Sequence, residues 1–131
     1  MKESNYSAGL RLKAMPWNLS ICKLKPGQIP PLTMPSFLGV TDEEVSLVCE
    51  TGKEPEELLE KDPGWRCMRI EGILDFSLIG ILSAITGILA ENKIGIFAVS
   101  TYNTDYILTR EAAFERALKV LEESGYVVLE G

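Results

Sequence analysis

Residues 95–111 read Gly-Ile-Phe-Ala-Val-Ser-Thr-Tyr-Asn-Thr-Asp-Tyr-Ile-Leu-Thr-Arg-Glu, and this stretch decides the fold of the second half of the chain. Two runs with strong strand preference, 96–102 and 106–109, are separated by a few small polar residues, which predicts a tight β-hairpin. Five hydrogen-bonding side chains gather at its end: Ser100, Thr101, Asn103, Thr104 and Asp105. The cluster indicates either a polar recognition edge or a simple turn, made by Asn103 and Asp105 beside ordinary strand residues.

The elements around this hairpin follow the order β-α-β-β-α-β. Residues 65–71 alternate like a strand, 77–93 and 110–124 carry apolar residues at helical spacing, and 126–129 close as a strand. This order is the split βαβ, or ferredoxin-like, arrangement. It predicts an antiparallel four-stranded sheet with both helices on one face. We expect the strand 65–71 to pair with the hairpin strand 95–102.

The first half of the chain repeats the pattern in an irregular form. Short strands are expected at residues 10–13, 19–24, 37–40 and 45–49. Pro26, Pro30, Pro31 and Pro35 exclude a long helix over residues 25–36. A short helix is expected over 55–61, followed by a break at Asp62-Pro63-Gly64. We place the boundary there, with residues 1–64 as an irregular N-terminal unit and 65–131 as the C-terminal unit.

The helix expected over 77–93 carries a stripe of small residues, Gly80, Ala84 and Gly87. Glycine inside a helix costs about 1 kcal/mol relative to alanine, so the stripe indicates a place where another backbone packs closely. The uncharged stretch 76–90 is shorter than the roughly 20 residues that span a bilayer, so we expect a core helix and no membrane contact. Exposed sheet edges or this stripe would form a homodimer.

Composition excludes several classes of function. The net charge is −6 and the 13 lysines and arginines are scattered, so nucleic acid is not expected as a partner. The chain has no histidine, which removes the commonest general base and metal ligand. No phosphate-binding or nucleophile motif is present either. We therefore expect no catalytic residues, no metal and no cofactor, and hence a protein that is not an enzyme.

The three cysteines and the N-terminus bear on localisation. Cys22, Cys49 and Cys67 each lie singly among apolar residues, which predicts buried reduced thiols. The first residues show neither an apolar core nor a cleavage pattern typical of export. We expect a cytoplasmic protein.

Several motifs of the second half resemble the ACT domain. Trp65-Arg66 leads to Ile70-Glu71-Gly72, then to Leu74-Asp75-Phe76-Ser77, and then to the hairpin of residues 95–108. This succession is similar to that of the small tandem ACT-domain proteins of bacteria and archaea, and the hairpin is similar to that of the CASTOR arginine sensors of animal cells. The resemblance covers nearly all of 65–131 and is weaker over 10–64. It implies an α+β fold of tandem ferredoxin-like units, the first irregular.

The resemblance also implies a function and a site. ACT domains bind small molecules, mostly amino acids, at interfaces between ACT units and act as regulatory modules. The ligand-binding residues so implied are Ile73, Leu74, Asp75, Phe76, Ser77, Leu78, Ser100, Thr101, Asn103 and Asp105. Backbone N–H groups at a helix N-terminus favour a carboxylate. Asp105 matches a ligand-contacting aspartate of the arginine sensors and would take an ammonium, with Asp75 as a second candidate. Leu78 stands where those sensors have an acidic residue, which argues against arginine as the ligand.

Alternatives to a ligand sensor stay open. The same fold can serve as a structural, oligomerisation or protein-interaction module without a ligand. Acylphosphatase-like hydrolysis shares the fold class, but it needs an arginine in the loop over 72–77, where there is none. The sequence carries no DNA-binding helix and no attached enzyme domain, so we expect any regulatory output to pass through an unidentified protein partner.

Overall fold

The computed structural model describes residues 10–72 and 80–130, which divide into two compact units. Among the described residues, unit 1 holds 10–16 and 66–130, and unit 2 holds 17–65. The first strand, which the sequence analysis places in the N-terminal unit, therefore lies in the same unit as the C-terminal half of the chain.

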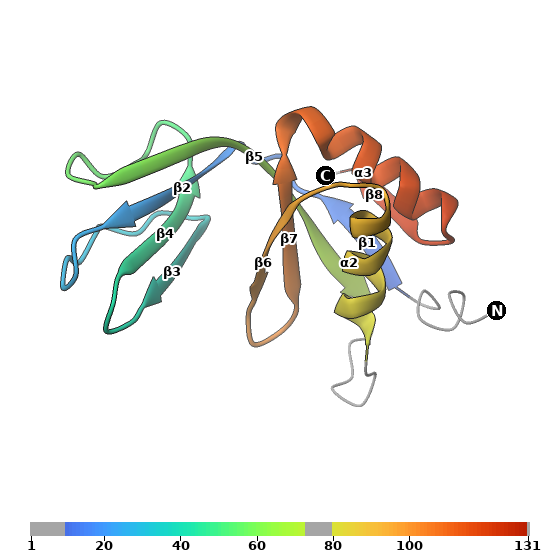
Figure 1. The fold of residues 1–131 in the computed structure, drawn as a ribbon, viewed down its shortest axis with the longest axis horizontal. Coiled ribbons are helices and arrows are strands. Elements are labelled where there is room, and N and C mark those ends of the chain that lie inside the picture. The colour runs from blue at the N-terminus through green and yellow to red at the C-terminus, as the bar shows by residue number, and fades with distance from the viewer. Residues whose placement is uncertain (1–9, 73–79, 131) are drawn as a thin grey trace. The chain divides into compact units, whose positions relative to one another are not determined.

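Unit 1 has the order of elements expected for the second half, with one strand added (Figure 1). Its elements are β1 (Leu10–Ala14), the second half of β5 (Glu60–Gly72), α2 (Ile81–Glu91), β6 (Ile96–Ser100), β7 (Asp105–Arg110), α3 (Glu111–Glu123) and β8 (Val127–Glu130). The strands of this unit lie in the order β6-β7-β5-β1-β8. The hairpin, both helices and the closing strand are confirmed.

The added strand β1 lies between β5 and β8. It pairs antiparallel with β5, with Leu12 opposite Ile70, and parallel with β8, with Leu12 opposite Val128. The sheet of unit 1 therefore has five strands among the described residues, and the expectation of four was wrong. A strand from the far end of the chain separates the two strands that the simple ferredoxin-like order would place side by side.

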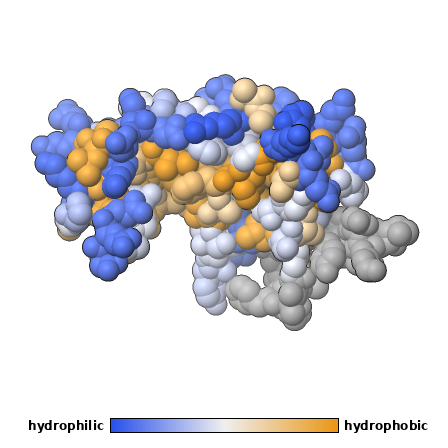
Figure 2. All heavy atoms as spheres, viewed as in Figure 1, coloured by the Kyte–Doolittle hydropathy of each residue, from blue (hydrophilic) through white to orange (hydrophobic). Residues whose placement is uncertain are grey.

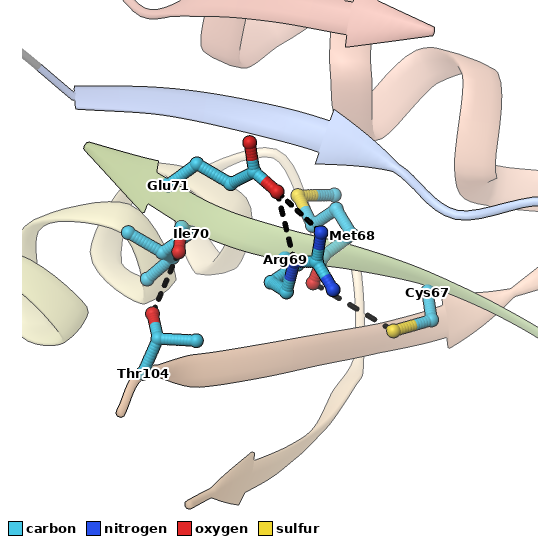
Figure 3. A network of polar contacts seen from close by, with 6 residues as sticks. All are labelled: Cys67, Met68, Arg69, Ile70, Glu71 and Thr104. Atoms are coloured by element: carbon cyan, nitrogen blue, oxygen red, sulfur yellow. Dashed lines mark hydrogen bonds and ion pairs between the residues drawn. The ribbon is translucent and has the colours of Figure 1, made fainter. Parts of the chain in front are cut away.

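The hairpin joins the sheet through its second strand. β7 pairs with both β5 and β6, so the expected pairing of 65–71 with the hairpin strand 95–102 was wrong. The split βαβ order explains this, because the connection through α2 leaves a gap between β5 and β6 that β7 fills. Figure 3 shows β7 running antiparallel to β5.

One hydrophobic core holds unit 1 together. Both helices pack on the same face of the sheet, as expected, and share the core with alternate residues of the strands. Its fully buried members include Leu12, Ile70, Ile85, Leu89, Ile107, Phe114 and Leu121. Arg66 also lies on this face, with its guanidinium 4.5 Å from the centre of the Phe114 ring. No helix among the described residues is both long enough and apolar enough to cross a bilayer.

The helix α2 is shorter than the sequence indicates. Gly80 precedes it with a φ of +89°, a left-handed conformation that glycine adopts without strain, and the helix begins at Ile81. Gly80 is therefore a cap and not an interior residue. Gly87 is exposed, and a Cβ atom there would meet nothing within 4 Å. The described part of the chain thus makes no close contact at Gly87.

Unit 2 is a small antiparallel sheet. It consists of β2 (Leu19–Leu24), β3 (Ser36–Val40), β4 (Val45–Glu50) and the first half of β5, in the order β3-β4-β2-β5. Cys22, Leu24, Val45, Leu47 and Cys49 form its core, and Leu58 packs against them. β3 and β4 confirm the strands expected at residues 37–40 and 45–49, and they form a hairpin with its turn between Thr41 and Glu44.

The segment before residue 65 differs from expectation. No helix forms over residues 55–61, because β5 already begins at Glu60 and pairs with β2. The expected break at Asp62-Pro63-Gly64 is instead a register shift within β5, opposite the stretch from Leu19 to Ile21. Gly64, with a φ of +88°, allows the strand to continue past the irregularity.

Candidate functional site

An open cavity of about 520 Å³ lies in unit 1 where the end of β5 meets the hairpin of β6 and β7. Its lining combines cations, one carboxylate and neutral hydrogen-bonding groups. The lining residues are Arg11, Arg69, Ile70, Glu71, Gly72, Thr101, Asn103, Thr104 and Tyr106. Such a lining suits a small polar molecule that carries charges of both signs.

Arg69 and Glu71 form the charged centre of the cavity (Figure 3). They lie two residues apart on β5 and so point to the same face of the sheet. Arg69 donates hydrogen bonds from Nε at 2.9 Å and from Nη2 at 2.5 Å to the same oxygen of Glu71, Oε2. Both side chains are partly exposed, at 28% and 24%. The pair is thus fixed in position while remaining within reach of a ligand.

The charges of this pair are reinforced by their surroundings. The pKa of Arg69 is raised by its hydrogen bond with Tyr106 and then by Glu71. The pKa of Glu71 is lowered, chiefly by the hydrogen bonds from Arg69 and further by the charges of Lys13 and Arg11. Both groups are therefore ionised at neutral pH.

The tip of the hairpin is held against β5. Thr104 donates a hydrogen bond of 2.6 Å from Oγ1 to the carbonyl oxygen of Ile70 (Figure 3). Within the tip, the backbone N–H of Thr101 and its hydroxyl both donate to the carbonyl oxygen of Thr104, at 2.8 and 2.9 Å. These bonds place the polar side chains of the tip beside the charged pair.

Two cations of β1 complete this side of the sheet. Arg11 lies opposite Glu71, and Lys13 lies opposite Arg69. Directly opposite residues of an antiparallel pair project from the same face. Because Leu12 and Ile70 point into the helical core, these four charged residues project from the face without helices.

The structure brings together only some of the residues expected from the sequence. Thr101 and Asn103 line the cavity. The hydroxyl of Ser100 donates to the Asp105 carboxylate, and neither residue is part of the cavity lining. Within the described residues, Asp105 therefore contributes to closing the hairpin, and its expected contact with a ligand stays a prediction. The six expected positions of the loop, Ile73, Leu74, Asp75, Phe76, Ser77 and Leu78, lie outside the described residues.

Sequence reasoning missed most of the charged lining. Arg69 and Glu71 could have been found from the sequence, because two charged residues at alternate positions of an otherwise apolar strand share one face. No local pattern predicts the position of Arg11, because its place beside Glu71 depends on the insertion of β1 next to β5. The part of the chain that the structure describes contains no cluster of metal-ligating side chains.

Comparison with known proteins identifies the domain around this cavity. Residues 60–123, just under half of the chain, match the ACT domain family. This match includes every lining residue of the cavity except Arg11. A search of curated protein sequences found no match.

Solved structures support the same fold. The chain is similar to the protein Atu0741 from Agrobacterium tumefaciens, with 29% identity and a TM-score of 0.84, covering 94% of both chains. It is also similar to VC0802 from Vibrio cholerae, described as a protein of unknown function and possible transport protein, with 19% identity, a TM-score of 0.69 and 94% coverage of both chains.

A third similar structure is a regulatory protein. The regulatory subunit of aspartate kinase from Thermus thermophilus, in its ligand-free form, has 12% identity and a TM-score of 0.61. The match covers 92% of this chain and 99% of that chain. At this identity the likeness concerns the fold.

Proposed function

We propose that this protein is a regulatory module that binds an amino acid in the cavity between β5 and the hairpin. The observation that carries the proposal is the lining itself, which offers cations and a carboxylate within one small polar space. The ACT domain over residues 60–123 supports a regulatory role, and the similar fold of an aspartate kinase regulatory subunit agrees with it.

The lining matches the functional groups that every amino acid carries. The α-carboxylate of the ligand would pair with Arg69, since a guanidinium group binds a carboxylate through two hydrogen bonds. The ligand ammonium would pair with Glu71. Thr101 and Asn103 would supply neutral hydrogen bonds at the hairpin tip. The loop of residues 73–78, expected from the ACT resemblance to contribute backbone N–H groups, adjoins Gly72 in the sequence and stays a prediction.

Ligand binding would join parts of unit 1 that lie far apart in the sequence. The lining comes from β1, from β5 and from the hairpin between β6 and β7. A ligand in contact with all three would stabilise their arrangement relative to the empty protein. This stabilised arrangement is what a partner protein would recognise, since a ligand shifts an equilibrium through its different affinity for two states.

A thermal-shift screen of the full chain against the twenty amino acids tests this proposal. A ligand present at about 100 times its dissociation constant adds roughly 2.7 kcal/mol to the free energy of unfolding. We expect at least one amino acid to raise the melting temperature by several degrees, and Arg69→Met to abolish the rise. A screen in which no amino acid changes the melting temperature would contradict the proposal.

A second candidate function is assembly of a homodimer through unit 2. Large hydrophobic side chains are exposed there, among them Ile29 at 90%, Met34 at 83% and Val40 at 65%. Figure 2 shows hydrophobic residues at the surface of the region that Figure 1 labels β2, β3 and β4. Within the described sheet β3 pairs only with β4, and its sequence, Ser-Phe-Leu-Gly-Val, has no charge of the kind that protects an edge strand.

Light scattering tests this second candidate. We expect the chain of 14.5 kDa to run as a dimer at micromolar concentrations, and Val40→Lys to shift it toward the monomer. Val127→Lys, an exposed valine at 53% in unit 1, is the matched control and should leave the dimer unchanged. A wild-type protein that is monomeric at these concentrations would contradict the candidate.

A further inference from the structure

The face of unit 1 without helices carries an excess of positive charge beside the cavity. Among the residues that the structure describes, Arg11, Lys13 and Arg69 project from this part of the face together with one carboxylate, that of Glu71. The local sum is therefore +2, in a chain whose net charge is −6. A concentration of positive charge on an acidic protein attracts anions to that place.

Cations lie close together in this arrangement, and among the described residues only Glu71 offsets them. Lys13 lies directly opposite Arg69 in the antiparallel pairing of β1 with β5. Like charges in this relation destabilise a sheet. Glu71 accepts two hydrogen bonds from Arg69, lies opposite Arg11 and interacts with the charge of Lys13, so one carboxylate faces three cations.

The neighbouring strands do not correct this imbalance. On the other side of β1, Lys13 lies opposite Leu129 and Arg11 lies opposite Val127 of β8. On the other side of β5, the cavity is lined by Tyr106 and by the neutral side chains of the hairpin tip. Among the described residues of these strands, Glu71 is thus the one carboxylate on this part of the face.

We propose that the cavity selects an acidic amino acid, aspartate or glutamate, a proposal that rests on the proposed function and names its ligand class. The two carboxylates of an acidic amino acid face the cations Arg11, Lys13 and Arg69, and its ammonium faces Glu71. The local sum of +2 falls to +1 with an acidic amino acid, stays at +2 with a neutral one and rises to +3 with a basic one. A dicarboxylate without an ammonium lowers the sum to 0 but offers Glu71 no donor. The cavity, at about 520 Å³, has room for either acidic ligand.

Isothermal titration calorimetry of the full chain at pH 7 and low salt tests the ligand class. L-aspartate, L-glutamate, L-asparagine, L-glutamine and succinate are the ligands to compare. We expect aspartate or glutamate to bind at least tenfold more tightly than its own amide, and aspartate to bind more tightly than succinate. Added salt should weaken binding of the acids more than binding of the amides, because salt screens exposed charges.

The outcomes separate this inference from the proposed function. If asparagine, glutamine or another neutral or basic amino acid binds as tightly as the acids, the ligand class is wrong and the proposed function stands. If succinate binds as tightly as aspartate, the role of the ammonium is wrong and so is the choice of an amino acid as ligand. If none of the twenty amino acids binds, both the ligand class and the proposed function are wrong.

Two variants test the cations directly. Lys13→Gln and Arg11→Gln should each reduce the preference for aspartate over asparagine by about tenfold, which corresponds to 1.4 kcal/mol. Lys23→Gln is the control, because it makes the same change in net charge at an exposed residue of β2 in unit 2. The ratio of the two affinities is the readout, since a general loss of folded protein lowers both alike. A ratio that is unchanged in both Lys13→Gln and Arg11→Gln would overturn the inference.

Discussion

The hydroxyl of Thr104 and the carbonyl oxygen of Ile70, 34 residues apart in the sequence, are joined by a hydrogen bond of 2.6 Å. This bond ties the tip of the hairpin to the end of β5. It fixes the position of Thr101 and Asn103 relative to Arg69 and Glu71, so the cavity depends on it as much as on the charged residues themselves.

Replacing Thr104 by valine should therefore destabilise unit 1. Valine keeps the shape of threonine but cannot donate to Ile70, which leaves a carbonyl oxygen without this partner. We expect the free energy of unfolding to fall by about 1 kcal/mol in urea denaturation. Thr104→Ser, which keeps the hydroxyl, is the control and should lose less. Equal losses in the two variants would show that the hydroxyl is not what matters.

The Arg69–Glu71 pair should make stability depend on pH. The pKa of Glu71 is lowered from 4.5 by the hydrogen bonds from Arg69, so the folded protein favours the ionised carboxylate. The contribution is fully present above a pH of about 4.5, the pKa of the unfolded state, and is lost as the pH falls through the lower pKa of the folded state.

Comparison with Glu71→Gln measures this contribution. Because the pair is partly exposed, we expect the wild type to exceed the variant by about 0.5 kcal/mol at pH 7. The difference should shrink below pH 4.5, where the wild-type carboxyl takes up a proton. A difference that is constant from pH 7 down to pH 2.5 would show that ionisation of Glu71 contributes nothing.

The place of β1 in the core of unit 1 can be tested with Leu12. Its side chain is completely buried between the sheet and the helices. Leu12→Ala should cost about 2–5 kcal/mol, because it removes buried methyl groups and leaves a cavity. Leu32→Ala, at a position 57% exposed, should cost less than about 0.5 kcal/mol. Similar small losses for both would show that β1 is not part of the core.

The three thiols should resist alkylation in the folded protein. Burial raises the pKa of Cys67 and of Cys49 to about 12 and also raises the pKa of Cys22. Relative to an ordinary pKa of 9.0, a pKa of about 12 lowers the thiolate fraction at pH 8 about a thousandfold. Iodoacetamide should thus label the cysteines only as fast as the protein unfolds. Rapid labelling of any of the three under native conditions would contradict their burial.

Much of the fold could be predicted because its signals are local. Periodicity and turn residues within a short window predict the hairpin, the two helices and the strands of the first half. The insertion of β1 and the pairing of β5 with β7 are contacts between distant segments, which local patterns do not specify. The helix expected over 55–61 failed because pairing with β2 fixes residue 60 onward as strand.

The residues of the site also fall into two groups, those that a local pattern predicts and those that depend on contacts between distant segments. Thr101 and Asn103 line the cavity, and the hairpin tip that carries them could be predicted because it is a local structure. Asp105 accepts a hydrogen bond from Ser100 and is not among the lining residues, so its contact with a ligand stays a prediction. Arg11 lies at the site only because β1 pairs with β5, so the sequence alone could not predict the balance of charges in the cavity.

The central claim, that a small amino acid binds between β5 and the hairpin tip, is tested most directly by nuclear magnetic resonance. The backbone amide spectrum of the isotopically labelled full chain would be recorded while the amino acid that gives the largest thermal shift is added. We predict that the signals of residues 69–72 and 101–106, and that of Arg11, change most. No change with any amino acid, or changes confined to residues 19–60, would contradict the account.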